Sequence, residues 1–226
     1  RVVILSKERG KIAAFARGAR RPNSALVGVT SPFSFGQFTV YEGRTSYTLV
    51  SASISNYFEE LRTDVEGAYY GFYFMDLANY YAREANDETL LLKLLYQTFR
   101  ALVNTRIPNR LIRYIYELKV ISINGEGPQV FECIGCGDRE QEKVFSIRRG
   151  GLLCRQCAAH VTDGRKLSVS TLYAMQYIIA SPVEKLYTFL VKEDVLKELG
   201  DVVTVYMAEY LGKSFKSLEI LETLIM

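Results

Sequence analysis

The sequence predicts an α+β protein in which a small N-terminal β barrel precedes a helical domain that carries an inserted cysteine-rich module. Three observations lead to this prediction. Short apolar runs separated by turns fill residues 1–56, helical periodicity fills residues 57–127 and 161–226, and every cysteine lies within residues 128–160. The chain has 226 residues, of which 49% are hydrophobic and 23% charged. This composition is typical of a globular protein and excludes a disordered or collagen-like chain.

The first 56 residues have the pattern of several short strands. Residues 2–5, 11–16, 38–41 and 46–54 are apolar or rich in Tyr, Thr and Val, and turn-like segments separate them. Short strands at close spacing predict a small barrel or a sandwich. A group of strands this small needs closure to protect its edges, which favours the barrel.

Residues 57–127 have the spacing of helices. The pair Asn86-Asp87 can cap a helix whose apolar residues between 90 and 102 keep to one face. Pro108 suits the first position of a further helix, which is expected to end near Gly125. This segment is therefore predicted to be the first part of a helical domain.

The second part of that domain is predicted over residues 161–226. Ser168 is expected to cap a helix, and residues 181–184 have the pattern of a capping box with proline at the first helical position. Gly200 is expected to interrupt the following helical stretch, and Gly212 to end it.

Two Cys-x2-Cys pairs are the most specific signal in the chain. Cys133 and Cys136 precede Cys154 and Cys157 by 17 intervening residues. Two tight turns of this kind can direct four sulfurs at one ion, which predicts a single structural Zn²⁺. Two disulfides or two redox dithiols are the alternatives, but a chain this apolar needs no disulfide staples and both pairs lie in polar, glycine-rich loops. Four thiolates also leave no open position for a catalytic water.

The single histidine, His160, lies three residues after the last cysteine and could replace one of them as a ligand, although an exposed loop position is the simpler interpretation. No Gly-x-Ser-x-Gly, P-loop or Gly-x-Gly-x-x-Gly pattern occurs. The sequence therefore predicts a protein that is not an enzyme. The longest uncharged stretches are interrupted by polar residues or proline, so no membrane span is expected. Because the sequence does not open with Met, we expect further N-terminal residues in the full protein.

Positive charge is concentrated at the N-terminus. Residues 1–50 carry a net charge of +6, whereas the whole chain carries +3. A local excess of this kind predicts a polyanionic partner such as nucleic acid, the alternative being a solvated face. The candidate DNA-binding residues are Lys7, Arg9, Lys11, Arg17, Arg20, Arg21 and Arg44. Aromatic residues lie between these cations and either stack on bases or fill the barrel: Phe15, Phe33, Phe35, Phe38, Tyr41 and Tyr47.

A second basic cluster lies near Pro108. Arg106, Arg110 and Arg113 are spaced four and three residues apart, so they share a face if the helix extends back to the first of them. Beside neighbouring apolar residues, they could hold an acidic peptide with an apolar tip. A solvated helix face is the alternative.

Taken together, these features resemble the bacterial recombination mediator family RecO. The resemblance covers almost the whole chain in order, and the combination is more specific than any single motif. The matching segments are Gly10-Lys11-Ile12, Ala16 to Arg21, Pro32-Phe33, Tyr116-Glu117-Leu118, Gly127-Pro128, the two cysteine pairs, Phe145-Ser146, Gly150 to Cys154, Leu211-Gly212-Lys213 and Lys216-Ser217.

The resemblance implies an OB-fold at residues 1–56, a helical domain at 57–127 and 161–226, and a zinc module at 128–160. It further implies binding of single- and double-stranded DNA and annealing of complementary strands. With RecR, such a protein helps to load RecA onto DNA coated by single-strand-binding protein (SSB). It also contacts the acidic C-terminal tail of SSB, for which Arg106, Arg110 and Arg113 are the candidates. A cytoplasmic, nucleoid-associated bacterial protein is therefore expected.

Two differences from the family pattern qualify this expectation. The family has its first OB strand before the position of Arg1, so a barrel formed by this sequence alone is expected to be open. Some members lack the cysteines. The metal is therefore expected to stabilise the fold of the inserted module, and not to provide the activity that all members of the family share. The rival prediction is a zinc-ribbon interaction module, for example of the transcription apparatus. A zinc hydrolase is disfavoured by the closed set of four thiolates.

Overall fold

The computed structural model describes residues 1–225 and divides the chain into two compact units. Among the described residues, the first unit comprises 1–103 and 217–225, and the second comprises 104–216. Strands dominate the N-terminal part and helices the rest, which confirms the α+β class. The units divide the predicted helical segment 57–127, because its first helices pack in one unit and its last helix in the other.

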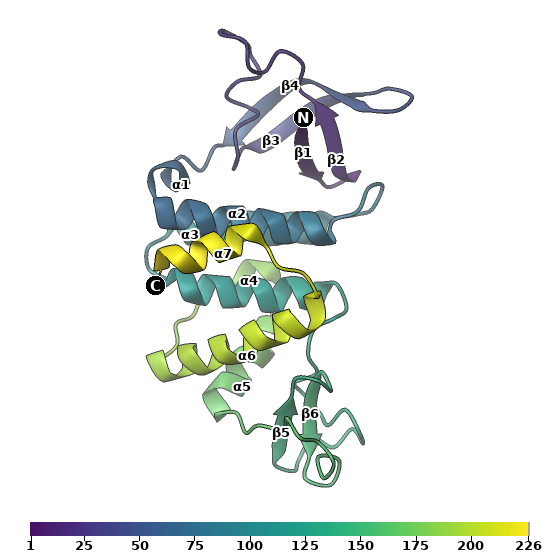
Figure 1. Cartoon of the computed structure of the whole chain (residues 1–226), viewed down its shortest axis with the longest axis vertical. Coiled ribbons are helices and arrows are strands. Elements are labelled where there is room, and N and C mark those ends of the chain that lie inside the picture. The colour runs from purple at the N-terminus through teal and green to yellow at the C-terminus, as the bar shows by residue number, and fades with distance from the viewer. Residues whose placement is uncertain (226) are drawn as a thin grey trace. The chain divides into compact units, whose positions relative to one another are not determined.

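A four-stranded sheet opens the first unit (Figure 1). Its strands are β1 (Val2–Ser6), β2 (Gly10–Phe15), β3 (Phe35–Glu42) and β4 (Tyr47–Asn56), in the order β1-β2-β4-β3. The two hairpins β1–β2 and β3–β4 are antiparallel, and the central pair β2–β4 is parallel.

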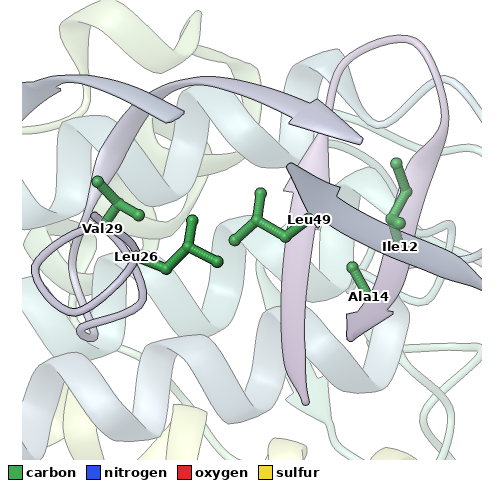
Figure 2. Close-up of a cluster of buried hydrophobic side chains, with 5 residues drawn as sticks. All are labelled: Ile12, Ala14, Leu26, Val29 and Leu49. Atoms are coloured by element: carbon green, nitrogen blue, oxygen red, sulfur yellow. The ribbon is translucent and has the colours of Figure 1, made fainter. Parts of the chain in front are cut away.

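One face of this sheet forms a small apolar core. Ile12 and Ala14 of β2 and Leu49 of β4 are buried, and the loop between β2 and β3 adds Leu26 and Val29 (Figure 2). Alternate residues of a strand point to opposite faces, so the residues between these core positions face away from the core.

A closed barrel is not confirmed. β1 and β3 are the edges of the sheet, and each pairs with only one neighbour among the described residues. A groove of about 970 Å³ runs along both edges, lined by residues such as Val2, Ile4, Phe38 and Val40. Closure would require one further strand bonded to both edges, and none of residues 1–225 supplies it.

Helices complete the first unit: α1 (Glu60–Thr63), α2 (Val65–Tyr81), α3 (Thr89–Val103) and α7 (Lys216–Ile225). Phe33 connects the loop before β3 to these helices, because its ring packs against Phe72 of α2 and Phe99 of α3. A Cβ atom at Gly71 of α2 would lie only 2.6 Å from the Phe33 ring, so glycine is what permits this contact. The hydroxyl of Ser217 donates a hydrogen bond to Asp76 of α2 (2.6 Å).

The second unit is built on α4 (Asn109–Ile123), α5 (Val169–Ala180) and α6 (Glu193–Leu211), with the hairpin β5 (Lys143–Ser146) and β6 (Gly151–Cys154) inserted before α5. Helix α4 is the centre of this unit, since every residue from 111 to 121 is buried. Its mean hydropathy alone does not indicate such burial, because α4 also carries charged residues. The buried Lys119 is paired internally, because its ammonium donates to the carbonyls of Ile179 and Ser181 at the end of α5 (2.8 and 2.7 Å).

Several predicted helix boundaries can now be compared with the structure. Ser168 caps α5, accepting a hydrogen bond from the Thr171 N–H (3.1 Å). Pro108 is the N-cap of α4 rather than its first helical residue. The capping-box pattern at 181–184 produces only one turn of 3-10 helix, η1 (Val183–Lys185). Gly212, with φ of +57°, ends α6 as predicted.

The predicted interruption at Gly200 is wrong, because α6 continues through it. The glycine serves packing instead. A Cβ atom there would lie 2.6 Å from the ring and hydroxyl of Tyr114 on α4. Gly200 thus lets α4 and α6 approach closely.

Replacing Gly200 by Ala is therefore expected to destabilise the protein by about 1 kcal/mol or more. Overpacking a tight contact costs about 1–3 kcal/mol, which outweighs the gain of up to about 1 kcal/mol in helix propensity. Urea unfolding measures the difference. Asp201→Ala, at the exposed neighbouring position, is the matched control and should change stability by no more than about 0.5 kcal/mol. A Gly200→Ala variant more stable than the parent would contradict the close approach.

None of the helices within residues 1–225 is both long and apolar enough to cross a membrane.

Candidate metal centre and basic surface

The four cysteines converge in the second unit. Their sulfur atoms all lie within 4.8 Å of one another, and those of Cys136 and Cys154 are 3.7 Å apart. A tetrahedral site with Zn–S bonds of about 2.3 Å places its sulfurs about 3.8 Å apart, so this spacing fits a bound zinc ion. It does not fit a disulfide, whose sulfurs are separated by about 2.05 Å. None of the four cysteines forms a disulfide.

Local turns aim the sulfurs inward. The backbone N–H groups of Gly135 and Cys154 donate to the sulfur of Cys133 at 3.4 and 3.3 Å. A Cβ atom at position 135 would lie 2.8 Å from the sulfur of Cys157, so glycine is required where the two turns meet. The first turn supplies Cys133 and Cys136, and the second follows directly from the end of β6.

The same hydrogen bonds set the acidity of the thiols. Burial raises the pKa of Cys133, but the N–H donors of Cys154, Gly135 and Cys136 outweigh it and lower this pKa to about 6. Hydrogen bonds to the sulfurs of Cys154, Cys133 and Cys136 raise the pKa of Cys157 to about 12. The lowered pKa of Cys133 favours its thiolate form, whereas a metal ion bound here would have to displace the proton of Cys157.

The cysteines also form much of the core of their own module. Cys133, Leu153 and Cys154 are buried together, and few other apolar side chains pack against them. So small an apolar core is typical of modules whose folded structure depends on a bound metal ion. The four cysteines are therefore suited to a closed, structural centre. His160 is exposed and is not among the clustered ligands.

Polar contacts that the sequence did not reveal hold this module, and the residues just before it, against α5 and α6. The hydroxyl of Tyr206 on α6 donates to the carbonyl of Glu126 (2.9 Å), and that of Tyr210 donates to the carbonyl of Ile147 (3.1 Å). The amide of Gln176 on α5 donates to the carbonyl of Val130 (2.6 Å). In the sequence, only the spacing of Tyr206 and Tyr210, one helical turn apart, could have indicated that both side chains contact the same neighbouring segment.

The predicted DNA-binding cations lie in the first unit, and all but Lys11, which is in β2, lie in turns and loops that connect its strands. Five of them are exposed and form no ion pair within residues 1–225: Lys7, Arg17, Arg20, Arg21 and Arg44. Arg9 is exposed too but pairs with Glu42 (3.2 Å). Lys11 is turned to the helices, where its ammonium donates to the carbonyl of Asn79 on α2 (2.8 Å). Five of the seven predicted cations are thus free on the loops, whereas Arg9 and Lys11 interact with other groups of the first unit.

The interleaved aromatic residues separate into two groups. Phe33 is buried against α2 and α3, and Phe35 packs against Tyr96 of α3. Phe38 and Tyr47 pack on the sheet core. In contrast, Phe15 and Tyr41 are 46% and 67% exposed.

The second basic cluster does not form one exposed face. Arg113 is buried and bonds to Glu117 on the next turn of α4 (2.8 Å). Arg106 precedes the helix, which starts only at Asn109, so the helical extension on which the shared face depends does not occur. Arg106 and Arg110 are both exposed, and Arg110 lies 3.9 Å from Glu193. An exposed site in this region can use only these two arginines.

The fold and the clustered thiols define a class of two-unit α+β proteins in which a four-cysteine cluster that could hold a metal ion is inserted into a helical unit. Two family models match the chain. The model described as Recombination protein O N terminal matches residues 1–58, and the model described as Recombination protein O C terminal matches residues 62–219. The chain belongs to the RecO family.

Individual relatives agree with this assignment. The DNA repair protein RecO of Acetivibrio thermocellus is 35% identical over 225 residues, which cover 99% of this chain and 89% of that protein. The protein of the same name from Alkaliphilus metalliredigens is 32% identical, covering 97% and 90%. That of Halalkalibacterium halodurans is 30% identical, covering 99% and 87%.

Proposed function

We propose that this protein acts in DNA repair and recombination as a mediator that binds DNA and anneals complementary strands. The observation that carries the proposal is the group of five free cations on the loops of the first unit, in a chain of the RecO family. Cations that contact phosphates bind single and double strands alike and reduce the repulsion between two strands that must pair. The protein acts by binding, without catalysing a bond-making step.

The proposal extends to partners. With RecR, the protein helps to load RecA onto DNA covered by SSB, and it contacts the acidic tail of SSB through the exposed Arg106 and Arg110. Contact with this tail would restrict the annealing activity to covered single strands. These roles place the protein in the bacterial cytoplasm, associated with the nucleoid.

The metal has a separate part in this proposal. Cys133, Cys136, Cys154 and Cys157 would hold one structural Zn²⁺, which supplies the cross-link that keeps the hairpin and its loops folded. DNA binding would not use it directly.

The test is annealing of two complementary strands that are each coated with the cognate SSB. We expect the protein to accelerate annealing, and the acceleration to disappear when the SSB lacks its C-terminal tail. Raising the salt concentration should reduce the acceleration steeply, because phosphate contacts release counterions. The control with uncoated strands separates annealing itself from recruitment. A lack of acceleration on both kinds of strand would overturn the proposal and favour a zinc-ribbon interaction module.

A further inference from the structure

The face of the sheet opposite its core carries a row of aligned side chains. Phe15 of β2 pairs with Thr48 of β4, which in turn pairs with Tyr41 of β3. Residues opposite one another in neighbouring strands project from the same face. With neighbouring strands about 4.8 Å apart, the two rings are attached roughly 10 Å from each other, on either side of the small threonine.

These rings are not part of the core. Their sequence neighbours Ala14 and Val40 face the core side, where the buried cluster of Figure 2 lies. The exposed row extends to Val50, which is 57% exposed next to a bulge in the β3–β4 pairing. An apolar patch of this kind on a sheet face indicates a binding surface.

The charges around the row indicate its partner. Arg17 follows Phe15 by two residues, and Arg44 follows Tyr41 by three in the β3–β4 turn. Both arginines are exposed. The nearby carboxylate of Glu42 is occupied by Arg9 and by the hydroxyl of Tyr47. Flat apolar rings between free guanidinium groups complement a ligand with flat apolar rings between phosphates.

We propose that Phe15 and Tyr41 form a stacking platform for unpaired bases of single-stranded DNA. This inference rests on the proposed function and specifies which of its substrates this face selects. Unpaired bases expose their faces to an aromatic ring, whereas bases in a duplex are stacked on one another and cannot reach it. The free cations would bind both forms of DNA, and the two rings would bind only the single strand.

Leucine substitutions test the platform because they keep apolar bulk and remove the ring. Phe15→Leu and Tyr41→Leu are each expected to weaken binding of the full chain to a labelled oligo-dT strand about fivefold, and the double variant roughly 25-fold. Duplex affinity should stay within about twofold of the parent, and the slope of affinity against salt should not change, because no phosphate contact is lost. Tyr41→Phe, which keeps the ring, should bind like the parent.

A fluorescence experiment gives an independent readout, because the chain contains no tryptophan. In a Tyr41→Trp variant, oligo-dT is expected to quench the single tryptophan by stacking, and a duplex is not. Tyr173→Trp in α5 is the matched control, since Tyr173 is also 67% exposed and lies in the second unit. Its emission should not respond to oligo-dT.

The outcomes separate the two proposals. If the parent protein binds oligo-dT and anneals strands, but both leucine variants bind equally well and Tyr41→Trp is not quenched, the stacking platform is wrong and the proposed function stands. If the parent protein binds no DNA, both are wrong. Equal losses for single strand and duplex in the leucine variants would also overturn the platform.

Discussion

Replacing Arg17, Arg20 and Arg21 together by alanine is expected to lower the affinity for single-stranded DNA about a hundred-fold at about 0.1 M salt. Each phosphate contact contributes a slope of about 0.7 to the dependence of log affinity on log salt, so three lost contacts reduce the slope by about 2. All three side chains are exposed on the loop after β2, so their loss leaves the core cluster intact. Fluorescence anisotropy of a labelled strand over a salt series measures both quantities.

The matched control removes the same charge from the other unit. Lys185, Lys192 and Lys197 are exposed around η1 and α6, and their triple alanine variant should retain the parent affinity and slope. Equal losses in the two triple variants would indicate that only net charge matters. An unchanged affinity in the arginine variant would show that the loop after β2 does not bind DNA.

Replacing Cys154 by Ser is expected to abolish metal binding and unfold the hairpin module. The buried sulfur of Cys154 lies 3.7 Å from that of Cys136, and a hydroxyl is a poor substitute for a thiolate ligand of zinc. Structural zinc contributes an apparent binding free energy of about 10–16 kcal/mol in small zinc domains, so its loss exceeds what the few apolar contacts of the module can offset. Elemental analysis should fall from one zinc per chain to none.

Hydrogen exchange shows which part of the protein unfolds in the Cys154→Ser variant. Amides of β5 and β6 should lose their protection in Cys154→Ser, whereas those of α2 and α3 in the other unit should keep it. His160→Ala is the control, because His160 lies outside the cysteine cluster, and this variant should retain one zinc and the protection of the hairpin. If Cys154→Ser retained both, the four-thiol centre would not be what holds the module together.

DNA binding and metal-dependent folding of the hairpin module should respond independently to these variants. A protein whose DNA contacts lie in the first unit should retain most of its DNA affinity when the hairpin of the second unit unfolds. Measuring the affinity of Cys154→Ser for oligo-dT therefore tests whether the metal stabilises only the hairpin module. A loss of affinity as large as that of the arginine variant would place the metal module in the DNA site.

Local patterns were sufficient to predict the features that depend on sequence spacing. The clustering of the four thiols follows from two Cys-x2-Cys turns, because two intervening residues bring both sulfurs of a pair to the same side. The cap at Ser168 and the helix end at Gly212 follow from interactions within a few residues. The family assignment likewise rests on motifs that are read along the chain.

Features that depend on distant partners were decided only by the tertiary structure. Gly200 has the local character of a helix breaker, but the ring of Tyr114 on another helix uses the space that it leaves. Arg113 has the spacing of an exposed arginine, but α4 is surrounded and the side chain is buried with Glu117. The periodicity of residues within one helix does not show how many sides of that helix are covered by other parts of the protein.

The same distinction explains the aromatic residues and the sheet. Alternation assigns Phe15 and Tyr41 to a strand, but strand pairing places them on one face, and packing of the β2–β3 loop makes the other face the core. Composition and spacing by themselves determined the α+β class, the thiol centre and the basic N-terminal segment. The tertiary structure decided which cations are free and which rings are exposed, because both depend on contacts between residues far apart in the chain.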